Sequence, residues 1–125
     1  MDKILVVNND MDTMTLLKDL LEKKSYSVKY TSSGEDSIRI AKKFEPALLL
    51  IDVLQKEYIP KLKAHPATAR IPVILMTGYS WNNEETNVSE ADAIIEKPFF
   101  IEQLQKKIQL ALLNKTEPGA THQEI

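Results

Sequence analysis

The sequence of 125 residues contains no cysteine and only three glycines, at positions 34, 78 and 119. The absence of cysteine excludes disulfide bonds and thiolate metal ligands, and it is typical of the reducing cytosol, so we predict a cytoplasmic location. With so little glycine, no glycine-rich loop follows the first predicted strand. The sequence therefore does not favour a small doubly wound enzyme or nucleotide binder.

Long apolar runs and an excess of one charge are missing as well. The longest unbroken apolar run, Ala47 to Ile51, is far shorter than the roughly 20 residues that cross a bilayer. The start, MDKILVV, lacks the apolar stretch and cleavage site of a signal peptide. A net charge of −2 is too balanced for a nucleic-acid surface. We therefore expect neither a membrane nor a nucleic acid as partner.

Strand and helix signals alternate along the chain, which favours one globular domain of the α/β class. Apolar or alternating segments predict five strands, within residues 4–7, 26–31, 46–52, 71–78 and 91–98. Apolar residues at helical spacing predict amphipathic helices around Met14, Leu17 and Leu21, around Ile38, Ala41 and Phe44, and from Ile101 to Leu113. The predicted fold is a doubly wound, five-stranded parallel sheet with helices on both faces.

Several residues predict where these elements begin and end. Asp10 or Asp12 can cap the first helix, and Ser32 to Glu35 form a possible capping box for the second. Pro60 limits any helix in its region to one that starts near it. A short helix is expected to begin near Asn82. We predict a domain over residues 1–113 and a polar tail over 114–125.

The residues that follow the strands matter most, because ligands bind beyond the carboxyl ends of parallel strands. They are Asn8, Asn9, Asp10, Asp52, Thr77 and Lys97. An aspartate there can act as a nucleophile toward a phosphoryl group, whose oxygens a lysine and a hydroxyl can bind. A magnesium ion would normally share the charge.

With these residues the chain resembles the receiver domain of two-component response regulators, the CheY-like or flavodoxin-like fold, over about residues 2–113. The matching pieces are "KILVV" with the polar cluster behind it, "TSSGEDSI", "LLLID", "LKAHPATARIPVILMTG" and "EKPF", in the family's order and near its spacing. The resemblance implies that Asp52 is the phosphoacceptor, that Thr77 is the hydroxyl that follows the phosphoryl group, and that Lys97 is the lysine with an invariant role. It also implies a cis peptide between Lys97 and Pro98.

Partners follow from the same resemblance. A histidine kinase or a phosphotransfer protein would supply the phosphoryl group in a phosphorelay. A downstream protein would bind the surface of the fourth helix, fifth strand and fifth helix, as in the family. Because we see no output domain after Leu113, we expect a stand-alone response regulator that signals by protein–protein interaction and is not an enzyme.

The chain departs from the family at the metal site. The family has an acidic pair where this chain has Asn8 and Asn9. An amide supplies no charge, and magnesium favours carboxylates. A Mg²⁺ site made by Asp10, Asn9, Asp52 and the Leu54 carbonyl is therefore expected to be weak or absent. Without the acidic pair, we predict a direct ion pair between Asp52 and Lys97 in the resting protein.

Two further departures favour an alternative function. The loop after Asp52 is short, and Ile94 stands where the family has a Tyr or Phe that swings inward on activation. With the Asn pair, they favour a pseudo-receiver interaction module that works without phosphorylation. Each residue also has a purely structural interpretation, since Asn pairs form turns and an Asp or Thr after a strand commonly caps a helix.

Overall fold

The fold is built on a five-stranded parallel sheet in the order β2-β1-β3-β4-β5. The computed structural model describes residues 2–78 and 90–113. The strands are β1 (Lys3–Val7), β2 (Ser27–Thr31), β3 (Leu48–Asp52), β4 (Val73–Thr77) and β5 (Ala93–Glu96). This arrangement confirms the predicted doubly wound sheet. The strand order reverses beside β1, and in such sheets a crevice at the reversal is the usual ligand site.

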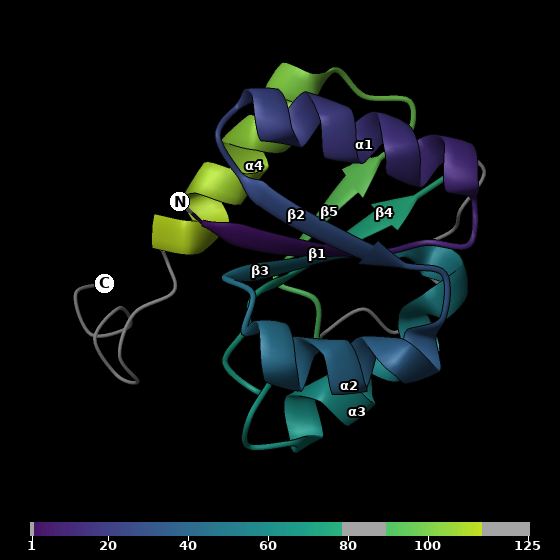
Figure 1. The fold of residues 1–125 in the computed structure, drawn as a ribbon, viewed down its shortest axis with the longest axis vertical. Helices are drawn as coiled ribbons and strands as arrows, with labels where there is room; N and C mark the ends of the chain where they lie inside the picture. Colours follow the sequence, from purple (N-terminus) through teal and green to yellow (C-terminus); the bar gives the residue numbers. More distant parts are fainter. Residues whose placement is uncertain (1, 79–89, 114–125) are drawn as a thin grey trace.

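Helices cover both faces of the sheet (Figure 1). On one face lie α1 (Met11–Lys23) and α4 (Ile101–Leu113), and on the other lie α2 (Gly34–Phe44) and α3 (Ile59–Ala64), with the 3-10 helix η1 (Val53–Tyr58) after β3. Side chains alternate along each strand, so the core has two halves. Ile4, Leu50 and Met76 belong to one half, and Leu5, Ile51 and Leu75 belong to the other. No helix among the described residues is long and apolar enough to span a membrane.

The helix starts agree with the sequence except at α2. Asp10 is the N-cap of α1, and Pro60 lies in the first turn of α3, as expected. The predicted capping box from Ser32 to Glu35 is wrong, because the N-cap of α2 is Ser33, whose hydroxyl accepts the Asp36 N–H at 3.1 Å. The helix begins one residue later because the Ser37 N–H donates to the Ser33 carbonyl at 3.0 Å, and the Ser32 carbonyl is bound by the side chain of Gln55 in η1.

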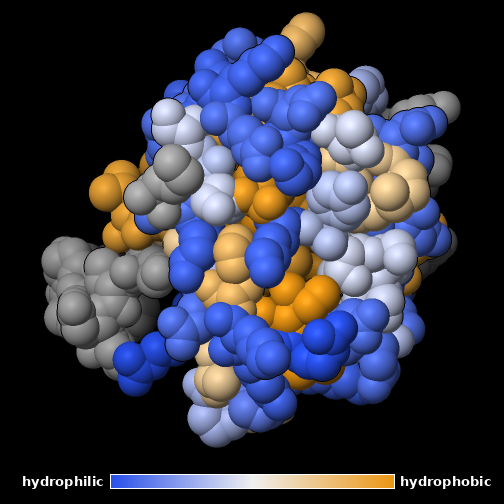
Figure 2. Space-filling view, in the orientation of Figure 1, coloured by the Kyte–Doolittle hydropathy of each residue, from blue (hydrophilic) through white to orange (hydrophobic). Residues whose placement is uncertain are grey.

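The face seen in Figure 2 is mostly hydrophilic, with small apolar areas between the two helical layers. Hydrophilic side chains on the outer surface are expected of helices that bury one side against a sheet. The helix predicted near Asn82 and the polar tail predicted over 114–125 lie outside the described residues.

Candidate functional site

The predicted site residues lie together at one edge of the sheet. They follow the carboxyl ends of β1, β3, β4 and β5. Val7 pairs with Ile51, so Asn8 and Asp52 follow side by side. Thr77 pairs with Glu96, and the Lys97 N–H donates to the Thr77 carbonyl at 2.7 Å. Asn8, Asp52 and Thr77 are all buried polar residues. Such a cluster at the end of a parallel sheet is a candidate site.

An ion pair lies at the centre of this cluster. The Lys97 ammonium donates to Asp52 Oδ1 at 2.8 Å. The Asp52 side chain is 6% exposed and that of Lys97 is 36% exposed, so water reaches the pair only from the lysine side. The second oxygen, Oδ2, accepts the Leu54 N–H at 2.9 Å and caps η1. The predicted Asp52–Lys97 ion pair is therefore confirmed, and both oxygens of the carboxylate are engaged.

The peptide bond between Lys97 and Pro98 is cis. This agrees with the expectation from the resemblance.

Asn8 places a neutral amide beside Asp52. Its Oδ1 accepts the Asp10 N–H at 2.8 Å. Its Nδ2 is buried and has no hydrogen-bond partner within residues 2–78 and 90–113. Asn8 therefore presents an uncharged amide to the pocket, with the donors on Nδ2 and one remaining lone pair on Oδ1. Its neighbour Asn9 is exposed.

Asp10 is committed to the start of α1. Its Oδ1 accepts the Asp12 N–H at 3.1 Å, and its Oδ2 accepts the Thr13 hydroxyl at 2.7 Å. The Thr13 hydrogen bond is the main cause of a lowered pKa of Asp10. Desolvation opposes it, while backbone N–H groups and the charge of Lys97 add to the lowering. The positive charge of Lys97 thus acts on both Asp10 and Asp52.

These residues do not fit a Mg²⁺ ion as they lie. Magnesium needs a near-octahedral set of oxygens with carboxylates among them. The Lys97 ammonium already lies against Asp52, both Asp10 oxygens accept hydrogen bonds in the helix cap, and Asn8 supplies only an uncharged amide. No group of three His, Cys, Asp or Glu residues that could hold a metal occurs in the described part of the chain.

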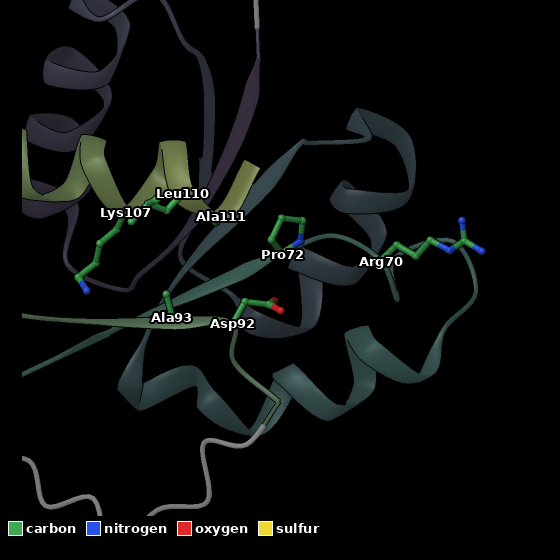
Figure 3. A pocket seen from close by; sticks show the side chains of 7 residues that line it. All are labelled: Arg70, Pro72, Asp92, Ala93, Lys107, Leu110 and Ala111. Carbon is green, nitrogen blue, oxygen red and sulfur yellow. The ribbon is translucent and has the colours of Figure 1, made fainter. Parts of the chain in front are cut away.

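Among the described residues, cavities lie at both ends of the strands. One, of about 500 Å³, lies next to the ion pair and is lined by Lys97, Pro98 and apolar residues of α1 such as Leu16. The other, of about 320 Å³, lies near the amino ends of β4 and β5, at the edge of the sheet opposite Asp52. Figure 3 shows that its two cationic side chains, Arg70 and Lys107, extend away from each other. The second cavity therefore lacks convergent polar groups, and the candidate site is the Asp52 cluster.

A family model described as the response regulator receiver domain matches residues 4–109. The chain belongs to the response regulator receiver family. This receiver is 30% identical to the transcriptional regulatory protein SrrA of Staphylococcus aureus over 129 aligned residues. The alignment covers 98% of this chain and 52% of SrrA. The receiver thus spans about half the length of the curated relatives it matches.

Solved structures show the same fold. A response regulator from Desulfuromonas acetoxidans superposes with a TM-score of 0.79 at 21% identity, over 90% of this chain and 98% of that one. The receiver domain of the sensor histidine kinase PA1611 from Pseudomonas aeruginosa, which has magnesium coordinated in its active site cleft, superposes with a TM-score of 0.80 at 22% identity, over 89% and 97%.

Two residues of this region were not singled out in the sequence. Thr13 binds Asp10, and the spacing of the two residues across a first helical turn could have indicated it. Gln55 connects η1 to the start of α2. No local pattern points to Gln55, because its partners lie 21 and 23 residues away in the sequence.

Proposed function

We propose that this receiver domain is a protein-interaction module of two-component signalling that works without phosphorylation of Asp52. The observation that carries the proposal is the Asp52–Lys97 ion pair at 2.8 Å. It lies in a pocket where Asn8 and Asn9 stand in place of the acidic pair of the family. The ammonium group neutralises the charge of Asp52, and within residues 2–78 and 90–113 the nearby carboxylate of Asp10 is bound in the cap of α1. The pocket then keeps the receiver shape without its metal chemistry.

The proposal follows from what phosphoryl transfer needs. The reaction depends on positive groups that stabilise charge on the transferring oxygens, together with a nucleophile that has a free lone pair. Here the Lys97 charge is already paired, and both Asp52 oxygens accept hydrogen bonds. Each Asp52 oxygen keeps a lone pair for attack, but the hydrogen bonds from Lys97 and Leu54 draw charge from the carboxylate and weaken it as a nucleophile.

A second candidate function is phosphoacceptance at Asp52, supported by the placement of Asp52, Thr77 and Lys97 at neighbouring strand ends. In that reaction an Asp52 oxygen attacks the phosphorus of a phosphohistidine on a histidine kinase or phosphotransfer protein. The P–N bond breaks, and the imidazole leaves and takes up a proton. Lys97 would then move from the carboxylate to the phosphoryl oxygens.

Intact mass after incubation with acetyl phosphate and Mg²⁺ tests the two candidates. We expect no added phosphoryl mass on the parent chain and an addition on the variant with both Asn8→Asp and Asn9→Asp, because that variant regains the acidic pair. Asp52→Asn in the same variant is the matched control and must abolish the addition. Phosphorylation of the parent chain at Asp52 would overturn the first candidate and establish the second.

A further inference from the structure

The amide side chain of Gln55 ties η1 to the connection between β2 and α2. Its Oε1 accepts the Gly34 N–H at 3.1 Å, and its Nε2 donates to the Ser32 carbonyl at 3.2 Å. Both polar atoms of one side chain thus bind the backbone of the same short segment. A two-point attachment of this kind fixes orientation as well as distance, because the amide group is planar.

The same side chain stands next to the Asp52 cap. Asp52 Oδ2 accepts the N–H of Leu54, the residue immediately before Gln55. Gln55 itself has non-helical backbone angles, φ −111° and ψ 18°, inside η1. The direction in which the Gln55 side chain points therefore depends on the position of the first turn of η1. That turn is held by the same carboxylate that pairs with Lys97.

The connection between β2 and α2 is tightly held on its other sides. The Asn8 N–H donates to the Thr31 carbonyl at 3.1 Å. A Cβ atom added at Gly34 would overlap the ring of Tyr58 and lie 2.6 Å from Gln55 Oε1. With so little free space, a shift of η1 must displace the start of α2, because packed elements do not deform continuously.

We propose that Gln55 is a positioning residue. It couples the hydrogen bond between Asp52 and the Leu54 N–H to the β2–α2 connection and the first turn of α2. A change at the Asp52 carboxylate is then transmitted to the surface through this connection, without a contribution from Ile94. Ile94 is a half-buried residue packed against the core half beneath α2 and α3, and it has no ring to reorient. This inference rests on the proposed function in one respect, namely that the domain signals through protein contacts.

Amide hydrogen exchange in the full chain tests the coupling, because two amides report its two ends. The Leu54 N–H reports the Asp52 cap, and the Gly34 N–H reports the Gln55 bond. We expect Asp52→Ala to speed exchange at both amides several-fold relative to a core amide such as that of Ile74. In the Gln55→Ala background, Asp52→Ala should change the rate at Gly34 no further.

The matched control is Gln103→Ala, which removes another amide side chain that accepts a backbone N–H, that of Phe100, at the start of α4. We expect no change at Gly34 in this variant. The inference is overturned if Asp52→Ala speeds exchange at Leu54 alone, or if Gly34 accelerates only in proportion to Ile74. It is also overturned if Asp52→Ala still accelerates Gly34 without Gln55. None of these outcomes depends on phosphorylation, so they are separate from the mass test above.

Discussion

Lys97 Nζ lies 2.8 Å from Asp52 Oδ1, and this contact joins the ends of two strands that do not pair with each other. The lysine thus supplies positive charge next to a buried aspartate.

Replacing Lys97 by Met should destabilise the domain by about 1–2 kcal/mol, as measured by urea unfolding. Breaking a buried pair by removing one partner costs roughly 3–5 kcal/mol. The cost is smaller here because the lysine side chain is 36% exposed, so water can reach the remaining carboxylate. Adding Asp52→Asn to this variant should restore most of the loss, because no charge is then left unpaired. A Lys97→Met protein as stable as the parent would show that the pair contributes nothing.

Mg²⁺ should leave the melting temperature of the parent chain unchanged at constant ionic strength. In the variant with Asn8→Asp and Asn9→Asp, added Mg²⁺ should raise it by several degrees, because a ligand that binds only the folded state stabilises it. Without Mg²⁺, this variant should melt below the parent, since carboxylates placed next to Asp52 repel one another. A clear Mg²⁺-dependent rise in the parent would mean that Asp10 or Asp52 leaves its present partners to bind the ion.

Gly34→Ala should cost about 1–3 kcal/mol of stability, which is the usual range for overpacking. The new methyl group would overlap the ring of Tyr58 and the oxygen of Gln55. Gly78→Ala is the matched control, because no atom of the described residues lies within 4 Å of a Cβ added there. Combining Gly34→Ala with Tyr58→Ala should be less harmful than the sum of the two changes. Equal stability of the Gly34 and Gly78 variants in denaturant unfolding would contradict the close packing of η1 on α2.

Thr13→Val should raise the pKa of Asp10 toward its ordinary value of 3.8, because the Thr13 hydroxyl is the main cause of the lowered pKa. A carboxyl whose pKa is lowered by folding stabilises the folded state above its unfolded pKa. That contribution disappears as the pH falls from 3.8 through the folded value. The valine variant should therefore lose less stability than the parent over this acid range. An NMR titration of the Asp10 carboxyl carbon measures the shift, and an unchanged pKa would contradict the assignment.

Much of the site was predictable because its residues directly follow buried strands. The apolar runs before Asp52 and Lys97 mark strand ends, and parallel strands bring such ends to one edge. The replacement of an acidic pair by Asn8 and Asn9 then predicted the ion pair, since a buried carboxylate requires a counter-charge. Local chemistry narrowed the cap of α1 to Asp10 or Asp12, and the structure shows that it is Asp10.

Other features depended on contacts that no local pattern contains. Gln55 binds the Ser32 carbonyl across 23 positions of sequence, next to the Ser33 cap that falls one residue later than predicted. Which polar atom of Asn8 meets the Asp10 N–H likewise decides that Nδ2 has no partner among the described residues.

The sequence by itself determined the five parallel strands, the helices on both faces and the identity of the charged residues at the strand ends. These depend on periodicity and on residue type, which are properties of short segments. Only the tertiary structure decided that both oxygens of Asp52 are occupied, that Asp10 is committed to α1 and that Gln55 connects η1 to α2. These depend on distances between segments far apart in the chain, and a difference of about 1 Å decides whether a hydrogen bond forms.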